Sequence, residues 1–307
     1  TRGMPKQPPM GEFIIGHEYA GTIAALGETV DEFKIGDRVA VEVHKGCGRC
    51  RNCIMGKYTV CLNYGNSAKG HRANGFTTNG GFAEYAVNHV NTLLKLPDTI
   101  SMDHAITITT AGTSLYGIDM AGGYIPGDTV AVLGPGSIGL MAVQCSKALG
   151  AGQVILTGTR DNRLALGRKL GADQVVNVKK ADPVEQVKAL TGGVGADFVL
   201  VASGQEASLQ QALEMTRKGG DITVLAHFEK PVMTDIGLAV KNGINLFTVR
   251  GEGRMSCHRA LSLMEEGKID GEALITHTFP LEEINEALAT FADRRDDALK
   301  VVVHPES

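Results

Sequence analysis

The sequence has no tryptophan, only 5% aromatic residues and a net charge of just −4. It contains no run of about 18 apolar residues that could cross a membrane, and its N-terminus lacks the apolar segment of a secretory signal. The sequence has no strongly basic region that would favour binding to nucleic acid. These absences predict a soluble, cytoplasmic protein with an aliphatic core, binding neither membranes nor nucleic acid.

The length of 307 residues suits about two domains. Glycine is unusually common, with 39 residues, which indicates many tight turns or close backbone contacts. The chain begins with Thr1 rather than Met, and its first dozen residues are rich in Pro and Gly. We therefore expect an N-terminal part of the natural protein to be missing.

The apolar pattern changes near the middle of the chain. Residues 13–97 contain short apolar runs broken by turn signals, which predicts an all-β domain with long loops. Beyond residue 127, buried strands alternate with helices up to about residue 249, with one helix expected over 207–219. Six strands with intervening helices predict a doubly wound parallel α/β sheet. Two further helices and two extended segments follow.

A glycine-rich turn follows the first of these strands. Gly134, Gly136 and Gly139 form GxGxxG between a strand and a helix, which is the context of a dinucleotide-binding fingerprint. The turn lets a pyrophosphate approach the helix N-terminus, whereas the alternative is a glycine turn with no ligand. The predicted cofactor-binding residues are Gly134, Pro135, Gly136, Ser137, Ile138, Gly139, Gly158, Thr159, Arg160, Thr113 and Ser203.

The end of the second strand indicates which dinucleotide is bound. Where an acidic residue would hold the ribose 2′-hydroxyl of NAD, the chain has Gly158, followed by Thr159 and Arg160. A small residue leaves room for a 2′-phosphate, to which Thr159 and Arg160 can donate hydrogen bonds. We therefore expect NADP(H) to be preferred over NAD(H). In the alternative, Arg160 is solvated and Asp161 binds the ribose.

Four of the six cysteines lie close together in the sequence, at Cys47, Cys50, Cys53 and Cys61. Four thiolates at this spacing can enclose one ion in a tetrahedral, structural zinc site. An iron–sulfur cluster is the rival interpretation, since thiolates bind both, and four unrelated free thiols are a third.

These motifs occur in the order seen in a known family. The segment Gly16–Gly21 (GHEYAG), then KIGDRVAV, the four cysteines, GGFAEYAV, GPGSIG, LITHTFPLEEINEAL and KVVVHP together resemble the zinc-containing medium-chain alcohol dehydrogenase family, NADP-using type. The resemblance covers almost the whole chain. It implies a GroES-like β-rich catalytic domain at 1–110 and 251–307, with its N-terminal part missing, and a Rossmann domain at 111–250. It also implies a homodimer or homotetramer.

The resemblance implies a catalytic zinc bound by His17 and Glu18. Relatives bring a first ligand, usually Cys, and a proton relay from before the GHE motif, and neither is in this sequence. A further ligand, usually Cys, Asp or Glu, falls at Thr110, and a threonine hydroxyl is a poor zinc ligand. Either Glu18 substitutes as a ligand, or the metal is weak or absent and threonines at 109, 110 and 113 bind nicotinamide or substrate instead. His44 and His71 could act as bases, although local structural roles fit them better.

The sequence is therefore expected to encode an enzyme that transfers hydride between NADP(H) and a small alcohol or carbonyl substrate. In this hypothesis zinc at His17 and Glu18 polarises the oxygen, and Thr110 belongs to the catalytic site. One alternative is an NADPH-dependent reductase of the same family without a catalytic zinc. Another is a non-catalytic NADPH-binding relative.

Overall fold

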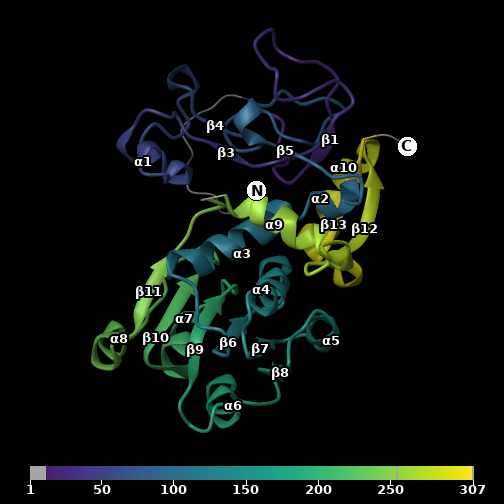
Figure 1. The fold of residues 1–307 in the computed structure, drawn as a ribbon. Coiled ribbons are helices and arrows are strands. Elements are labelled where there is room, and N and C mark those ends of the chain that lie inside the picture. Colours follow the sequence, from purple (N-terminus) through teal and green to yellow (C-terminus); the bar gives the residue numbers. More distant parts are fainter. Residues whose placement is uncertain (1–11, 254, 306–307) are drawn as a thin grey trace. The chain divides into compact units, whose positions relative to one another are not determined.

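The structure is a computed structural model, and it describes residues 12–253 and 255–305. The chain folds into two compact units (Figure 1). One, here called the parallel-sheet unit, is Thr113–Arg250. The other, here called the split unit, contains residues 12–112 and continues from Gly251 to the C-terminal end of the described chain.

The parallel-sheet unit is built on six parallel strands in the order β11-β10-β9-β6-β7-β8. The strands are β6 (Thr129–Leu133), β7 (Gln153–Gly158), β8 (Gln174–Asn177), β9 (Ala196–Val201), β10 (Thr216–Val224) and β11 (Asn245–Thr248). This order runs outward from β6 in both directions, so the strand order reverses at β6 and β9. Ligands of doubly wound sheets bind at such a reversal, beyond the carboxyl ends of the strands.

Helices connect successive strands of this sheet, as parallel pairing requires. They are α4 (Ser137–Ala148), α5 (Asp161–Lys169), α6 (Pro183–Leu190), α7 (Ser208–Met215) and α8 (Ile236–Asn242), while α3 (Ile108–Met120, whose first turn belongs to the split unit) precedes β6. The start of α6 is set locally, because the Asp182 side chain accepts hydrogen bonds from the backbone N–H groups of Val184 and Glu185, and Pro183 occupies the first turn. An aliphatic core without aromatic members forms between the sheet and α7.

The structure corrects the helix predicted over 207–219. Helix α7 ends at Met215, and β10 begins at Thr216 with an irregularity before Asp221. The hydroxyl of Thr216 donates to the carbonyl of Ala212, and Gly219 adopts a φ of +69°. This arrangement ends the helix and turns the chain directly into the strand.

The split unit contains short strands in three small sheets. The strands are β1 (Ala20–Thr22), β2 (Arg38–Val41), β3 (His44–Lys45), β4 (Arg72–Ala73), β5 (Leu93–Lys95), β12 (Ile275–Pro280) and β13 (Lys300–His304). Its α-helices are α1 (Arg51–Ile54), α2 (Met102–Ala105), α9 (Ser256–Glu265) and α10 (Ile284–Asp293), and its 3₁₀ helices are 58–60, 67–69, 90–92, 272–274, 281–283 and 295–297. The 13–97 region is therefore loop-rich, as predicted, but it is not purely β because it also contains α1 and 3₁₀ turns.

No helix among the described residues is both long enough and apolar enough to span a membrane.

Candidate active site

The three fingerprint glycines sit at the end of β6 and the start of α4, and each has a different environment. Gly134 has a φ of +104°, and a Cβ there would lie 2.9 Å from the Cβ of Ser203. A Cβ on Gly139 would lie 1.9 Å from the carbonyl oxygen of Gly134. A Cβ on Gly136 would meet no atom within 4 Å. The first and third glycines thus permit the turn and its packing, while the second borders open space, as the close approach of a pyrophosphate requires.

The end of β7 is tightly packed against this turn. A Cβ on Gly158 would lie 2.4 Å from Cδ of Pro135. An acidic side chain therefore has no room at this position unless the glycine turn moves.

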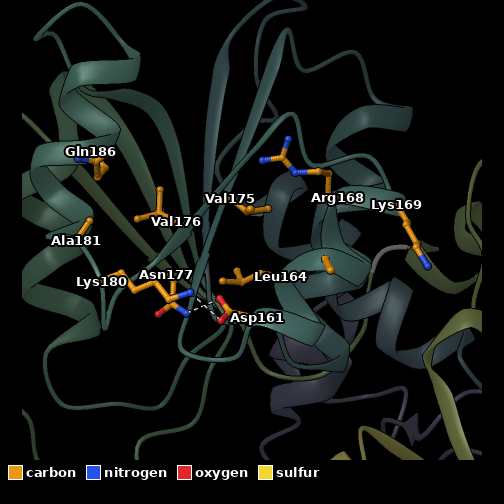
Figure 2. Close-up of a pocket in the computed structure, with 11 residues that line it drawn as sticks. Asp161, Leu164, Arg168, Lys169, Val175, Val176, Asn177, Lys180, Ala181 and Gln186 are labelled. Atoms are coloured by element: carbon orange, nitrogen blue, oxygen red, sulfur yellow. Dashed lines mark hydrogen bonds and ion pairs between the residues drawn. The ribbon is translucent and has the colours of Figure 1, made fainter.

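Asp161, the alternative ribose ligand, already has two partners within its unit. Its carboxylate accepts a hydrogen bond of 2.7 Å from Asn177 and pairs with Lys180 at 2.8 Å. These bonds lower its pKa below the ordinary value. All three residues line an open pocket of about 780 Å³ with an apolar floor of Leu164, Val175 and Val176 (Figure 2). Residues of α5, β8, α6 and the segment between β8 and α6 line that pocket, and the glycine turn does not.

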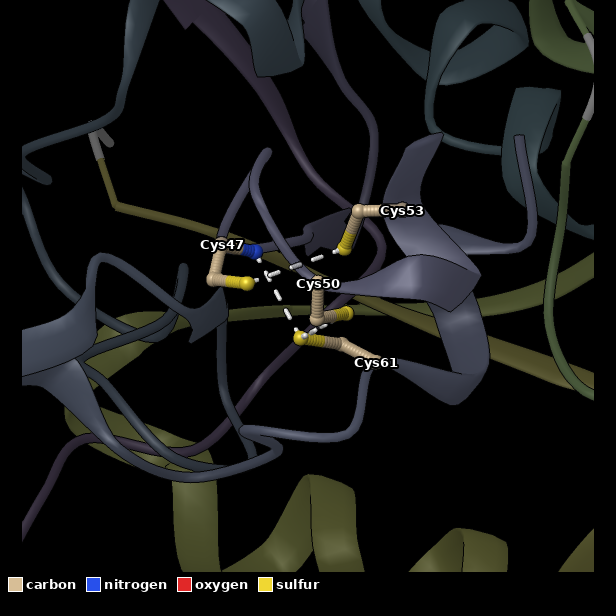
Figure 3. A group of neighbouring side chains, drawn as sticks. All are labelled: Cys47, Cys50, Cys53 and Cys61. Atoms are coloured by element: carbon tan, nitrogen blue, oxygen red, sulfur yellow. Dashed lines mark hydrogen bonds between the residues drawn. The ribbon is translucent and has the colours of Figure 1, made fainter. Parts of the chain in front are cut away.

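The four clustered cysteines lie together in the split unit (Figure 3). Their sulfur atoms all lie within 4.8 Å of one another, with Cys47 to Cys53 at 4.0 Å and Cys50 to Cys61 at 3.8 Å. Tetrahedral zinc with Zn–S bonds of about 2.3 Å separates its sulfurs by about 3.8 Å, so the arrangement fits zinc. The backbone and side-chain N–H groups of Asn63 donate to Cys61 and Cys47, as is favourable for thiolates.

His17 lies just before β1 in a loop whose path depends on glycines. The N–H of Gly81 donates to the carbonyl of Gly16 at 2.9 Å, and a Cβ on Gly80 would overlap that carbonyl at 1.9 Å. The His17 ring packs against Phe76 with 4.5 Å between ring centroids, yet the residue keeps an exposed surface. Surrounding protein atoms lower the pKa of His17 and outweigh the opposing charge of Glu18. The imidazole is therefore neutral at pH 7 and able to ligate a metal.

Glu18 is held by partners on both carboxylate oxygens. Lys300 of β13 pairs with Oε2 at 2.6 Å, and the hydroxyls of Thr110 and Thr109 donate to Oε1. Burial opposes ionisation of Glu18, but Lys300, His17 and these hydrogen bonds lower its pKa to about 2. Thr110 thus donates to the neighbouring carboxylate.

The described residues complete one metal site but not a second. Among residues 12–253 and 255–305, the four cysteines are the only group of three or more potential His, Cys, Asp or Glu ligands. His17 and Glu18 supply two donors of suitable chemistry for zinc, without a third. The first-ligand segment expected before the GHE motif lies outside the described residues.

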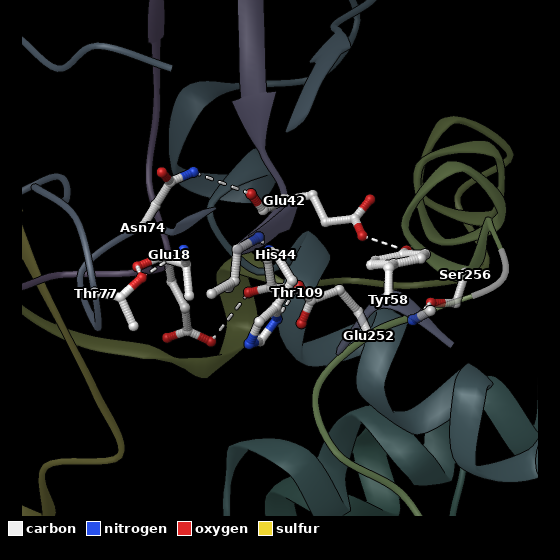
Figure 4. Close-up of polar contacts among 12 residues, drawn as sticks. Glu18, Glu42, His44, Tyr58, Asn74, Thr77, Thr109, Glu252 and Ser256 are labelled. Carbon is white, nitrogen blue, oxygen red and sulfur yellow. Dashed lines mark hydrogen bonds and ion pairs between the residues drawn. The ribbon is translucent and has the colours of Figure 1, made fainter. Parts of the chain in front are cut away.

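A second buried polar cluster lies in the split unit and was not predicted from the sequence (Figure 4). His44 contacts Glu252 at 3.1 Å, and Tyr58 donates a hydrogen bond to Glu42. Burial and the charge of Glu252 raise the pKa of Glu42 to about 8. The sequence contains only a weak indication of this cluster. Its acidic residues are not recognisable as buried from the sequence, and the local pattern does not distinguish His44 from a solvated histidine.

A parallel-sheet unit with a dinucleotide-type glycine turn, followed in the same chain by a four-cysteine cluster whose geometry fits zinc, is typical of zinc-containing nicotinamide oxidoreductases. Residues 1–98 match the family model for the alcohol dehydrogenase GroES-like domain, and residues 137–266 match that for zinc-binding dehydrogenase. The chain is 31% identical to sorbitol dehydrogenase of Bacillus subtilis (strain 168) over 294 residues, which is 95% of this chain and 81% of the relative.

Solved structures of dehydrogenases are also similar to this chain over most of its length. A zinc-binding dehydrogenase of Sinorhizobium meliloti 1021 bound to NADP has a TM-score of 0.88 at 26% identity and covers 98% of this chain and 85% of its own. An alcohol dehydrogenase from Escherichia coli CFT073 complexed with NADH has a TM-score of 0.84 at 27% identity, with coverages of 94% and 82%. The chain belongs to the zinc-containing medium-chain alcohol dehydrogenase family. It is an alcohol dehydrogenase-type oxidoreductase acting on small molecules.

The comparisons confirm the predicted fold class and family. The expected preference for NADP(H), the cytoplasmic location, and the homodimer or homotetramer stay predictions.

Proposed function

We propose that this protein transfers hydride between NADP(H) and a small secondary alcohol or its ketone. The parallel-sheet unit, 111–250, would bind the dinucleotide, and the remainder, 1–110 and 251–307, would form the catalytic domain. The observation that carries the proposal is an accessible, neutral His17 imidazole beside a Glu18 carboxylate fixed by Lys300.

Preference for NADP(H) is supported by the β7–α5 turn. No carboxylate fits at Gly158, because Pro135 occupies the space of a Cβ there. Asp161 is engaged by Lys180 and Asn177. Arg160 stands at the N-terminus of α5, where a helix dipole also favours an anionic group. A 2′-phosphate would therefore meet positive rather than negative potential.

At the reacting centre, His17 would ligate zinc, and zinc bound there would polarise the substrate oxygen. The chain's own residues prepare this site. Lys300 and the hydroxyls of Thr109 and Thr110 neutralise and orient Glu18, so its carboxylate keeps one geometry. The nearby Phe76 ring restricts rotation of His17.

A second candidate is an NADPH-dependent carbonyl reductase of the same family without a catalytic zinc. It is favoured by the engagement of both Glu18 oxygens with Lys300, Thr109 and Thr110, and by the lack of a third ligand among the described residues. Hydrogen-bond donors would then stabilise the developing oxyanion.

The test combines zinc content with turnover. The full chain and two variants, His17→Ala and the exposed control His258→Ala, are analysed for zinc per chain and for NADPH formation from sorbitol, 2-propanol and 2,3-butanediol. We expect about two zinc ions in the parent and the control, and one in His17→Ala with at least a hundredfold lower turnover. One zinc in the parent with undiminished turnover would instead support the zinc-free reductase.

A further inference from the structure

The buried pair of His44 and Glu252 is not used by the chemistry described above. Glu252 follows β11 in the chain, and its Oε1 accepts hydrogen bonds from the backbone N–H groups of Val43 at 3.0 Å and His44 at 3.3 Å. The same oxygen lies 3.1 Å from Nδ1 of His44 (Figure 4). Both side chains are buried and belong to the split unit.

This geometry fixes the tautomer of His44. Burial disfavours an ionised Glu252, but the charge of His44 and the hydrogen bonds that reach the carboxylate outweigh it, so the pKa of Glu252 is lowered. An ionised carboxylate only accepts hydrogen bonds, so Nδ1 of His44 must carry the hydrogen. When this imidazole is neutral, its remaining lone pair is on Nε2.

The packing around His44 occupies the edge of the ring beside Nε2. Gly251 covers the edge formed by Nδ1 and Cε1, since a Cβ there would lie 3.0 Å from Cε1 and 3.2 Å from Nδ1 of His44. Phe76 stacks on His44 with 6.4 Å between centroids and 12° between planes, and it also contacts His17. Within the described part of the chain, no hydrogen-bond partner of Nε2 is found. Phe76 is thus a common neighbour of His44 and of the proposed zinc ligand His17.

We propose that His44 is the proton acceptor for the substrate hydroxyl and that Glu252 is its positioning residue. In alcohol oxidation the O–H bond breaks and its proton moves to Nε2 of His44. The electron pair of the carbinol C–H bond leaves as hydride to NADP⁺, and the C=O bond forms. Ketone reduction reverses each transfer. This assignment rests on the proposed hydride-transfer function.

The arrangement of a carboxylate behind an imidazole stabilises the imidazolium formed on proton transfer. Other ionisable groups face the pair from the elements around it: Glu42 after β2, Tyr58 of the 58–60 turn, Cys257 of α9, His17, and Tyr64, whose ring centroid lies 6.2 Å from that of His44. Glu42 is the one that changes charge near neutrality, because its pKa is about 8. Below that pH Glu42 is mainly neutral, and the carboxylate that lies against His44 is that of Glu252.

The test compares four variants of the full chain. His44→Gln and Glu252→Gln change the pair, while His304→Gln and Asp103→Asn change an exposed His–carboxylate pair of the same unit, with 2.9 Å between its atoms. The pH profiles of kcat and KM are measured for NADP⁺ reduction by 2,3-butanediol, 2-propanol and sorbitol.

We expect His44→Gln to lower kcat/KM by about 10²–10⁴-fold and to abolish the acid limb of the profile. Glu252→Gln should lower kcat by roughly 10–100-fold with little change in KM, and should shift the acid limb to lower pH because the imidazolium loses its counter-charge. Both control variants should retain the parent profile.

An unchanged acid limb in His44→Gln, with activity within about threefold of the parent, would overturn the assignment. Failure of the proposed function appears differently, as a parent enzyme that binds NADPH but oxidises none of the three alcohols. In that case ¹⁵N spectra of the imidazole decide the positioning claim. An Nδ1–H tautomer in the parent that is lost in Glu252→Gln supports it, and an Nε2–H tautomer in the parent contradicts it.

Discussion

Glu42 is a buried carboxyl whose ionisation should affect the stability of the fold near neutral pH. Its carboxyl is buried, receives a hydrogen bond from Tyr58 and lies close to the ionised Glu252. A folded-state pKa of about 8 exceeds the ordinary value of 4.5, so folding favours the protonated form. The free energy of unfolding should therefore fall as the pH rises from about 4.5 to about 8 and level off above it.

Replacing Glu42 by Gln should remove this pH dependence. The amide keeps an oxygen for the Tyr58 hydroxyl but cannot ionise, so Glu42→Gln should stabilise the protein by up to about 3 kcal/mol near pH 8 and by little near pH 5. Urea unfolding of parent and variant at both pH values measures the difference. Glu265→Gln, a change on the exposed side of α9, is the control and should shift neither value. A gain that is equal at both pH values would contradict the raised pKa.

The residue contacts that define the site were the hardest to predict from the sequence. Lys300 and Glu18 are 282 residues apart, and Glu252 and His44 are 208 apart. The spacing of residues along the sequence does not indicate such pairs, because they form only when the chain returns to the split unit after the parallel sheet. The cysteines were predictable because all four ligands lie within one short loop.

At the scale of elements, alternating apolar segments and glycine turns predicted the parallel sheet, because buried strands and their connecting helices each carry a local signal. The end of α7 was missed, since Arg217 and Lys218 continue a helical pattern that Thr216 and Gly219 interrupt. The loop-rich part at 13–97 is held by long-range contacts rather than by long strands. Its strands are short, so the sequence of this part shows little apolar alternation from which they could be predicted.

The β7–α5 turn should control the choice of dinucleotide. Arg160→Ala should lower the ratio of NADPH to NADH affinity by about tenfold or more, because a charge-assisted bond to the 2′-phosphate is lost. Titration of each cofactor measures the ratio, and Arg168→Ala, in the last turn of the same helix, is the matched control.

Gly158→Asp gives a further check at that turn. It should weaken both dinucleotides rather than create an NAD-specific protein, because its Cβ collides with Pro135 in the glycine turn. Tight NADH binding by Gly158→Asp, or an unchanged ratio in Arg160→Ala, would show that the turn does not select the cofactor.

The cysteine loop has little apolar packing of its own. Helix α1 buries none of its residues, and the 58–60 turn buries only Thr59. Zinc should therefore hold the loop together. Cys53→Ser should lower the zinc content by one ion per chain and expose Arg51 and Lys57 to trypsin, while NADPH affinity persists in the other unit.

Cys145→Ser, a change at a buried cysteine of α4, is the control and should keep both zinc and protease resistance. If Cys53→Ser kept a full zinc complement, or lost zinc without becoming cleavable, the structural role of the metal would be wrong.

At the scale of the whole molecule, the chain leaves the split unit within α3 and returns to it at Gly251. The parallel-sheet unit is therefore inserted in the sequence of the split unit. The returning segment brings Glu252 to Val43 and His44, and Lys300 to Glu18 of the GHE motif. The parallel-sheet unit carries the dinucleotide signal and the split unit carries the polar and metal chemistry. Such a division suits hydride transfer between a bound cofactor and a separately held substrate.

The most direct test of the central claim is the initial rate of NADPH formation when the full chain is given NADP⁺ and each of the three alcohols. We predict turnover with at least one of them, a rate with NADP⁺ that exceeds the rate with NAD⁺, and at least a hundredfold loss in His17→Ala. A parent that binds NADPH tightly but forms none from any of these alcohols, or a His17→Ala variant as active as the parent, would contradict the account.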